Sequence, residues 1–267
     1  MFCFQCQETA KGTGCVLKGV CGKSAFTARN MDLLLFVVRG IAVAADSLRQ
    51  HNVDPGKETD TFVTDALFST ITNANFDDES IMRRIDRGLE MRDALKARAE
   101  TEGIALPGAD ELEWTGTRAD YDAKAATVGV LREENEDLRS LKELVMYGLK
   151  GMAAYLEHAM RLGYDDAEIH AFMQNALALT TVGNLTADEL TALVMKTGEV
   201  GVRTMALLDK ANTATYGNPE ATNVNIGVRN RPGILISGHD LHDLKLLLEQ
   251  TEGKGINIYT HSEMLPA

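Results

Sequence analysis

The chain has 267 residues, of which 45% are hydrophobic and 25% are charged, an ordinary composition for a globular protein. Lys and Arg number 27 whereas Asp and Glu number 39, so the formal net charge is −12. A surface this acidic repels phosphate groups, so we expect neither a nucleic-acid partner nor an anionic membrane partner.

The most apolar stretch runs from Leu33 to Val38 and continues from Ile41 to Ala45, with Arg39 between the two parts. It is too short and too interrupted to span a bilayer, so we expect a buried core helix. A secretory signal would need a basic and then an apolar segment, and the first cysteine already stands at position 3. We therefore expect a cytoplasmic protein, whose thiols stay reduced unless a metal holds them.

Residues 1–26 form a cysteine-rich segment, which we interpret as a loop that binds a metal cluster. All four cysteines of the chain lie here, at Cys3, Cys6, Cys15 and Cys21. Four soft thiolates hold an iron–sulfur cluster, and a C-x2-C pair lets neighbouring thiolates reach two irons of one cluster. Zinc sites also use C-x2-C but usually have a second close pair, and disulfides are rare in a reducing compartment. The spacing favours iron–sulfur and leaves zinc as the alternative.

The residues around these cysteines suit a tight, negatively charged site. Glycines let a loop turn closely around a cluster; they stand here at positions 12, 14, 19 and 22. Lys11, Lys18 and Lys23 would offset the negative charge of a cluster.

The helical spacing of apolar residues across 27–220 predicts a helical domain. We expect it to consist of two three-helix bundles joined by a linker near residues 103–120. Before the linker we expect a helix around Met31–Ala42, one from about Asp60 to Asn73, and one capped by Asp77. After it we expect a long helix ending before Gly163, one opening at Asp165, and one from Thr186 to about Asn212. Thr186 and Glu189 have the spacing of a capping box.

The pattern of residues 221–267 predicts the beginning of an α/β domain with a Rossmann-like parallel sheet. Gly233–Ser237 is typical of a buried strand, Asp240–Gln250 of a helix, and Gly255–Tyr259 of a second strand. Two strands do not make a stable domain, so we expect a truncated domain and a natural chain that continues, or a fragment.

Several segments resemble the hybrid-cluster (prismane) proteins. The stretch Met1-Phe2-Cys3-Phe4-Gln5-Cys6-Gln7-Glu8-Thr9, followed by Gly14-Cys15 and Gly19-Val20-Cys21-Gly22-Lys23, is similar to the N-terminus of that family. The later matching segments are residues 72–76, 216–220, 233–240 and 259–267. The resemblance covers the whole chain.

The resemblance implies two metal centres and an enzymatic activity. The four cysteines match the subgroup with an N-terminal [4Fe-4S] cluster, which would relay electrons to a hybrid [4Fe-2O-2S]-type cluster. The implied reaction reduces hydroxylamine to ammonia, or reduces nitric oxide in nitrosative stress, with electrons from a redox donor protein. The implied fold is a helical domain of two three-helix bundles followed by α/β domains.

His239 and Glu263 match a histidine and a glutamate ligand of the hybrid cluster in that family. The family's other ligands are cysteines and a second glutamate in the C-terminal half, and this chain has no cysteine after Cys21. We therefore expect this chain alone to be inactive unless the C-terminal half is supplied, for example as a separate chain. The alternatives are an electron-transfer fragment with only the [4Fe-4S] cluster and a zinc-stabilised helical scaffold.

Overall fold

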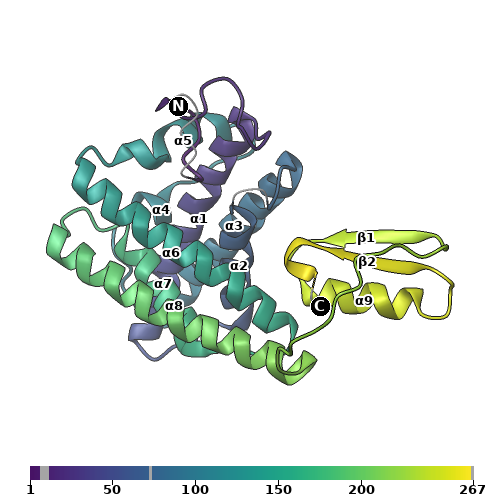
Figure 1. Cartoon of the computed structure of the whole chain (residues 1–267). Coiled ribbons are helices and arrows are strands. Elements are labelled where there is room, and N and C mark those ends of the chain that lie inside the picture. Colours follow the sequence, from purple (N-terminus) through teal and green to yellow (C-terminus); the bar gives the residue numbers. More distant parts are fainter. Residues whose placement is uncertain (7–11, 72–73, 266–267) are drawn as a thin grey trace. The chain divides into compact units, whose positions relative to one another are not determined.

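A computed structural model describes residues 1–6, 12–71 and 74–265 and is mainly helical (Figure 1). The chain divides into two compact units, Met1–Asn212 and Thr213–Ala267. The helices of the first unit are α1 (Ala25–Gln50), α2 (Lys57–Ser69), α3 (Asp78–Thr101), α4 (Asp110–Glu113), α5 (Tyr121–Val128), the short 3-10 helix η2 (Val130–Arg132), α6 (Glu136–Arg161), α7 (Ala167–Leu179) and most of α8 (Ala187–Tyr216).

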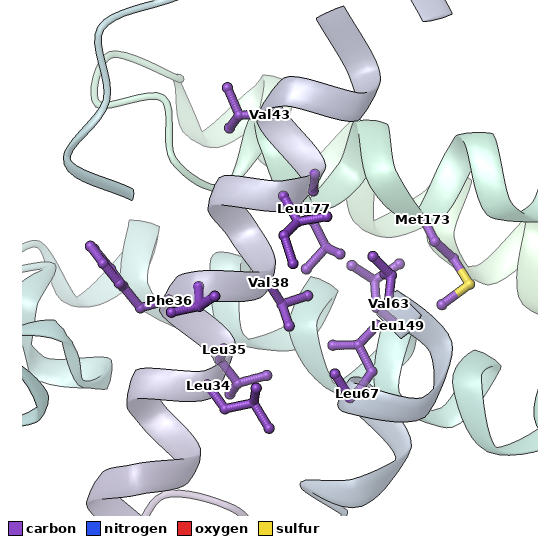
Figure 2. Close-up of a cluster of buried hydrophobic side chains, with 14 of the residues drawn as sticks. Leu34, Leu35, Phe36, Val38, Val43, Val63, Leu67, Leu149, Met173 and Leu177 are labelled. Carbon is purple, nitrogen blue, oxygen red and sulfur yellow. The ribbon is translucent and has the colours of Figure 1, made fainter. Parts of the chain in front are cut away.

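Helix α1 is the core of the first unit, as the apolar run predicts. Eighteen of its 26 residues are buried, including all of Leu33–Val38, because it packs against α2, α3, α4, α5 and α7. Figure 2 shows side chains of α1 converging with those of other helices, among them Val63 and Leu67 from α2, Leu149 from α6 and Leu177 from α7. Burial on all sides explains why the run is apolar around the whole helix rather than along one stripe.

Helix starts follow from local hydrogen-bonding residues. The side chain of Asp77 accepts from the N–H groups of Glu79 and Ser80, so this residue caps α3 as predicted. At the head of α8, Glu189 accepts from the Thr186 N–H at 2.8 Å, and the Glu189 N–H donates to Thr186 Oγ1 at 3.3 Å. Both halves of the expected capping box are therefore present. Gly163, with a φ of +82°, follows the end of α6 and provides the expected stop.

Other boundaries shift by a few residues. Helix α2 begins at Lys57 and ends at Ser69, earlier at both ends than expected, and residues 72–73 lie outside the described part of the chain. Asp166, not Asp165, caps α7, and α8 extends to Tyr216. The expected linker contains α4, after which the only tryptophan, Trp114, packs edge-on against Phe36 with ring centroids 6.1 Å apart.

The division of the helices into two three-helix bundles is not confirmed. Helix α1 packs most extensively against α3, which precedes the linker, and also against α7, which follows it. One central helix therefore serves both groups. No helix within the described residues combines the length and the apolar character needed to cross a membrane.

The second unit is a small strand–helix–strand unit. It contains β1 (Gly233–Ser237), α9 (Leu241–Thr251), β2 (Asn257–His261) and the 3-10 turn η3 (Ser262–Met264). The two strands are parallel, with Gly233 opposite Asn257 and Ser237 opposite His261. The parallel pairing agrees with the prediction, although β2 begins two residues later; a larger Rossmann-like sheet is not confirmed.

The prediction that β1 is buried is wrong for this chain. Leu235 is 69% exposed, and the other residues of β1 are exposed or half-buried. A single neighbouring strand and a single helix leave much of the strand uncovered, so its apolar side chains remain in contact with solvent.

Candidate metal centres

The cysteine segment lies at the start of the first unit, and within the described residues none of its four cysteines is part of a disulfide. Cys15 is buried, Cys3 is half-buried, and Cys6 and Cys21 are exposed. The segment is closed by backbone hydrogen bonds from Phe2 N–H to Cys15 C=O at 3.0 Å and from Gly19 N–H to Lys23 C=O at 2.9 Å. The first bond brings the start of the chain next to Cys15, and the second closes the turn that contains Cys21.

Two glycines in this segment occupy positions where a side chain would collide. Gly14 has a φ of +67°, and a Cβ atom there would lie 1.9 Å from Met1 Sδ. A Cβ atom on Gly19 would lie 2.9 Å from the Lys23 carbonyl oxygen and 3.3 Å from Cys21 Sγ. The glycines therefore allow the close chain approach that the sequence predicts for them.

Lys23 supplies positive charge to the thiols. Its side chain is 1% exposed, and its Nζ donates to Met31 Sδ at 2.9 Å. Burial lowers the pKa of Lys23, and the nearby thiols of Cys3, Cys21 and Cys6 oppose this by raising it. The effect of burial is the larger, so the pKa of Lys23 lies below its ordinary value. Of the lysines named as counter-charges, Lys18 is exposed and Lys11 lies outside the described residues.

The Cys3 thiol shows why that charge matters. Burial raises the pKa of Cys3, while the Gln5 backbone hydrogen bond and the Lys23 ammonium oppose the rise. A thiolate at this position therefore requires compensation by a nearby cation. Across the described residues, no three His, Cys, Asp or Glu side chains lie close enough to hold a single metal ion.

Sequence reasoning missed a buried polar group beside the C-x2-C pair. Gln5 Nε2 donates to Asp32 Oδ1 at 3.0 Å, and Lys150 Nζ donates to Gln5 Oε1. Burial raises the pKa of Asp32 to about 7 and lowers that of Lys150 to about 8. Two charged residues on otherwise apolar helix faces were the available clue, but the sequence does not show that both would contact Gln5.

In the second unit the structure brings together His239 and Glu263, the two residues matched to the hybrid cluster. His239 follows the end of β1, after Gly238 with a φ of +134°, and Glu263 lies in η3, just after β2. His239 Nδ1 and Glu263 Oε2 are hydrogen-bonded although the residues are 24 positions apart. The side chains are 74% and 68% exposed, so both remain accessible. Carboxyl ends of parallel strands are where α/β folds bind ligands.

The neighbouring pair of the sheet forms a second contact. Ser237 Oγ and His261 Nδ1 lie 3.0 Å apart, at the last register position of β1 and β2. Ser262 then has a φ of +57°, which turns the backbone so that Glu263 can meet His239. A positive φ on a non-glycine residue at this point is a local distortion next to the candidate site.

The chain belongs to the Prismane/CO dehydrogenase family, whose sequence model matches residues 1–267. It is 60% identical over its full length to the hydroxylamine reductase of Bacteroides thetaiotaomicron, covering 48% of that protein. It is 58% identical to the hydroxylamine reductases of Porphyromonas gingivalis and Desulfitobacterium hafniense, again over its full length and 49% of theirs. The resemblance to hybrid-cluster proteins is thus confirmed, and the chain spans about half the length of the curated relatives it matches.

Proposed function

We propose that this chain is the N-terminal half of an iron–sulfur oxidoreductase that reduces hydroxylamine to ammonia, or a related nitrogen oxide such as nitric oxide. The observation that carries the proposal is the contact between His239 and Glu263, which pairs an imidazole with a carboxylate at the ends of two parallel strands. The names of the relatives supply the substrate class. A redox donor protein would provide electrons.

The cysteine segment fits a [4Fe-4S] cluster in its donor chemistry. It offers four cysteines outside any disulfide, a buried lysine ammonium, and two glycines at positions where a Cβ atom would collide with neighbouring atoms. Soft thiolates with nearby positive charge and backbone N–H donors are the surroundings that such clusters use. Cys3, Cys6, Cys15 and Cys21 would hold the cluster, and the exposed Cys6 and Cys21 would face an incoming electron donor.

His239 and Glu263 would hold part of the hybrid [4Fe-2O-2S]-type cluster, with the remaining ligands supplied by the C-terminal half. When His239 Nδ1 donates to Glu263 Oε2, the lone pair of Nε2 stays available for a metal, and Glu263 keeps Oε1 as a second donor. A carboxylate bonded to a metal-binding histidine fixes its tautomer and raises its basicity. When bound, the clusters would supply electron transfer and an iron site for the substrate.

The proposed reaction consumes two electrons and two protons for each hydroxylamine and yields one ammonia and one water. The N–O bond breaks, the nitrogen is reduced, and the donor protein is oxidised. Within this chain, the exposed imidazole and carboxylate would hold a proton between His239 Nδ1 and Glu263 Oε2 next to the substrate position.

The first test measures iron, zinc and acid-labile sulfide per chain after purification without oxygen. About four irons with matching sulfide support the cysteine site and, if no more is found, indicate an electron-transfer fragment. About eight irons, with the C-terminal half present, support both centres. Zinc with little iron would contradict the proposal and favour the zinc-stabilised scaffold.

The second test places His239→Ala and Glu263→Gln in the protein that includes the C-terminal half. We expect at least a hundredfold loss of hydroxylamine reduction with retention of the [4Fe-4S] electron paramagnetic resonance signal. His242→Ala in α9 is the matched control and should retain activity. Unchanged turnover in both site variants would exclude these residues from the reaction.

A further inference from the structure

The two residues between Cys3 and Cys6 are both held by helix α6. The Phe4 carbonyl accepts a hydrogen bond from Tyr147, and the Gln5 side chain accepts one from Lys150. Tyr147 and Lys150 stand three positions apart, so their side chains lie on the same side of the helix. The short C-x2-C turn is therefore fixed at consecutive residues by one rigid element.

Gln5 also connects this turn to helix α1. Its amide Nε2 donates to Asp32 Oδ1 at 3.0 Å, while its Oε1 accepts from Lys150, so both ends of the amide are used. The partners are 27 and 145 residues away in the chain. Gln5 is 6% exposed, although its neighbour Cys6 is exposed. The side chain is thus inserted into the helical body.

Stability alone is a poor explanation for the charges at this position. Asp32 is 8% exposed and Lys150 is 5% exposed. Burying a carboxylate and an ammonium costs several kcal/mol for each ion, and replacing buried ion pairs by apolar residues is often neutral or stabilising. The opposing pKa shifts of the two groups reflect that cost. Such charges are best explained by a task beside the cysteine turn.

Other charged groups define the electrostatic surroundings. Arg39 of α1 and Glu143 of α6 act on both Asp32 and Lys150, and the Lys23 ammonium also acts on Lys150. The guanidinium Nη2 of Arg39 lies 4.0 Å from the carboxylate Oε1 of Glu143. A polar cavity of about 190 Å³ adjoins the group and is lined by Gln5, Asp32 and Lys150 together with Arg39 and Glu143. These charged groups therefore border a small, polar cavity.

We propose that Gln5 and Tyr147 are positioning residues that fix the Cys3–Cys6 turn in its ligating conformation, and that Asp32 and Lys150 tune the reduction potential of the cluster. The inference rests on the proposed [4Fe-4S] assignment. A reduced cluster carries one more negative charge than an oxidised one. A nearby ammonium stabilises the reduced state, and a nearby carboxylate destabilises it.

The test compares cluster-loaded chains purified without oxygen, all at the same pH. Gln5→Leu should lose iron to a chelator at least about tenfold faster than wild type, because both hydrogen bonds of the amide disappear. Tyr147→Phe removes one hydroxyl at the edge of the site and should accelerate iron loss more weakly. Gln50→Leu is the matched control, since Gln50 is an exposed glutamine of α1 whose side chain donates to Asp46.

The second readout is the midpoint potential, followed by electron paramagnetic resonance. Asp32→Asn should raise the potential and Lys150→Met should lower it, whereas a purely structural role would not produce shifts of opposite sign. Shifts in the same direction, no shift, or iron loss from both Gln5→Leu and Tyr147→Phe at the wild-type rate would overturn the inference. Absence of iron and sulfide from the wild type would overturn the cysteine assignment and this inference together.

Discussion

Asp32 is a residue whose charge depends on its surroundings. It lies in the buried part of α1, and its carboxyl accepts a hydrogen bond from Gln5. Burial raises its pKa to about 7, so the folded protein keeps the Asp32 proton over a pH range in which the unfolded chain has released it. Stability should therefore decrease as pH rises from about 4 to about 7, because the folded state binds more protons there.

Asp32→Asn should remove this pH dependence while keeping an oxygen that accepts from Gln5. From pH 4.5 to 6.5 the free energy of unfolding of wild type should fall relative to the variant by roughly 2–3 kcal/mol, since one pKa unit corresponds to about 1.4 kcal/mol. Urea denaturation at several pH values measures the difference. Asp122→Asn, which removes an exposed carboxylate partner of Arg29, is the control for loss of a carboxylate at the surface. A constant difference for Asp32→Asn would contradict the predicted shift.

At the scale of elements, the 3-10 turn η3, which directly follows β2, begins with an unfavourable backbone conformation next to the candidate site. Ser262 has a φ of +57°, which costs a non-glycine residue about 1–2 kcal/mol. The turn brings Glu263 to His239, so the conformation has a structural consequence at the candidate site. Strain of this kind is typical of residues next to binding sites.

Ser262→Gly should stabilise the second unit by about 0.5–1 kcal/mol, because relief of the strained backbone outweighs the greater entropy of glycine in the unfolded chain. Hydrogen exchange of the β1 and β2 amides measures local opening. Ser237→Gly is the control in the same sheet, where the backbone is extended; it should destabilise the unit. A destabilising Ser262→Gly would mean that the positive φ is not the source of strain.

The capping box at the start of α8 should contribute measurably to the first unit. Thr186→Ala removes the hydroxyl that accepts from the Glu189 N–H and should cost about 1 kcal/mol in urea denaturation. Thr191→Ala is the matched control, since Thr191 is exposed within the same helix and its hydroxyl donates to the Ala187 carbonyl. Alanine is the better helix former there, so the control should be neutral or slightly stabilising.

These elements show what the sequence determines locally. Periodicity, Asp77, Gly163 and the Thr186–Glu189 spacing predicted helix positions because each acts within one or two helical turns. The small helix α4 was missed because the glycines and Pro107 of its segment indicated a connection. The parallel strands were predicted from the strand–helix–strand pattern, whereas His239 and Glu263, which follow them, were selected by the resemblance to the family.

Contacts between distant residues were not predictable in the same way. Gln5 lies between two cysteines, and nothing nearby in the chain identifies Asp32 or Lys150 as its partners. The role of α1 as a helix shared by both groups also depends on packing between distant segments, which one sequence does not reveal. The exposure of Leu235 likewise depends on what surrounds the strand rather than on the strand itself.

At the scale of the whole molecule, the two units differ in their cores. The first unit surrounds the buried helix α1, whereas the described part of the second unit buries only Leu244 and Met264. Residues 217–232, which precede β1, contain no helix or strand, and Arg229 and Arg231 are exposed there. Unfolding free energy should therefore be distributed unevenly, with the second unit opening more readily.

Trypsin should first cleave this chain after Arg229, because the bond after Arg231 precedes Pro232 and resists the enzyme. Mass spectrometry of an early digest should show a fragment of residues 1–229. Arg229→Gln is the control and should slow the first cleavage strongly. Initial cleavage at Arg203 or Lys210, both within α8, would instead show that this helix opens before the irregular segment.

The contact between Trp114 and Phe36 gives the protein a natural optical reporter. The chain has one tryptophan, and its indole ring packs against a buried ring of the central helix. Its fluorescence emission should therefore report unfolding of the first unit and should not change when the strand–helix–strand unit opens. Comparing the fluorescence with a signal from the whole backbone would separate the two transitions without any added label.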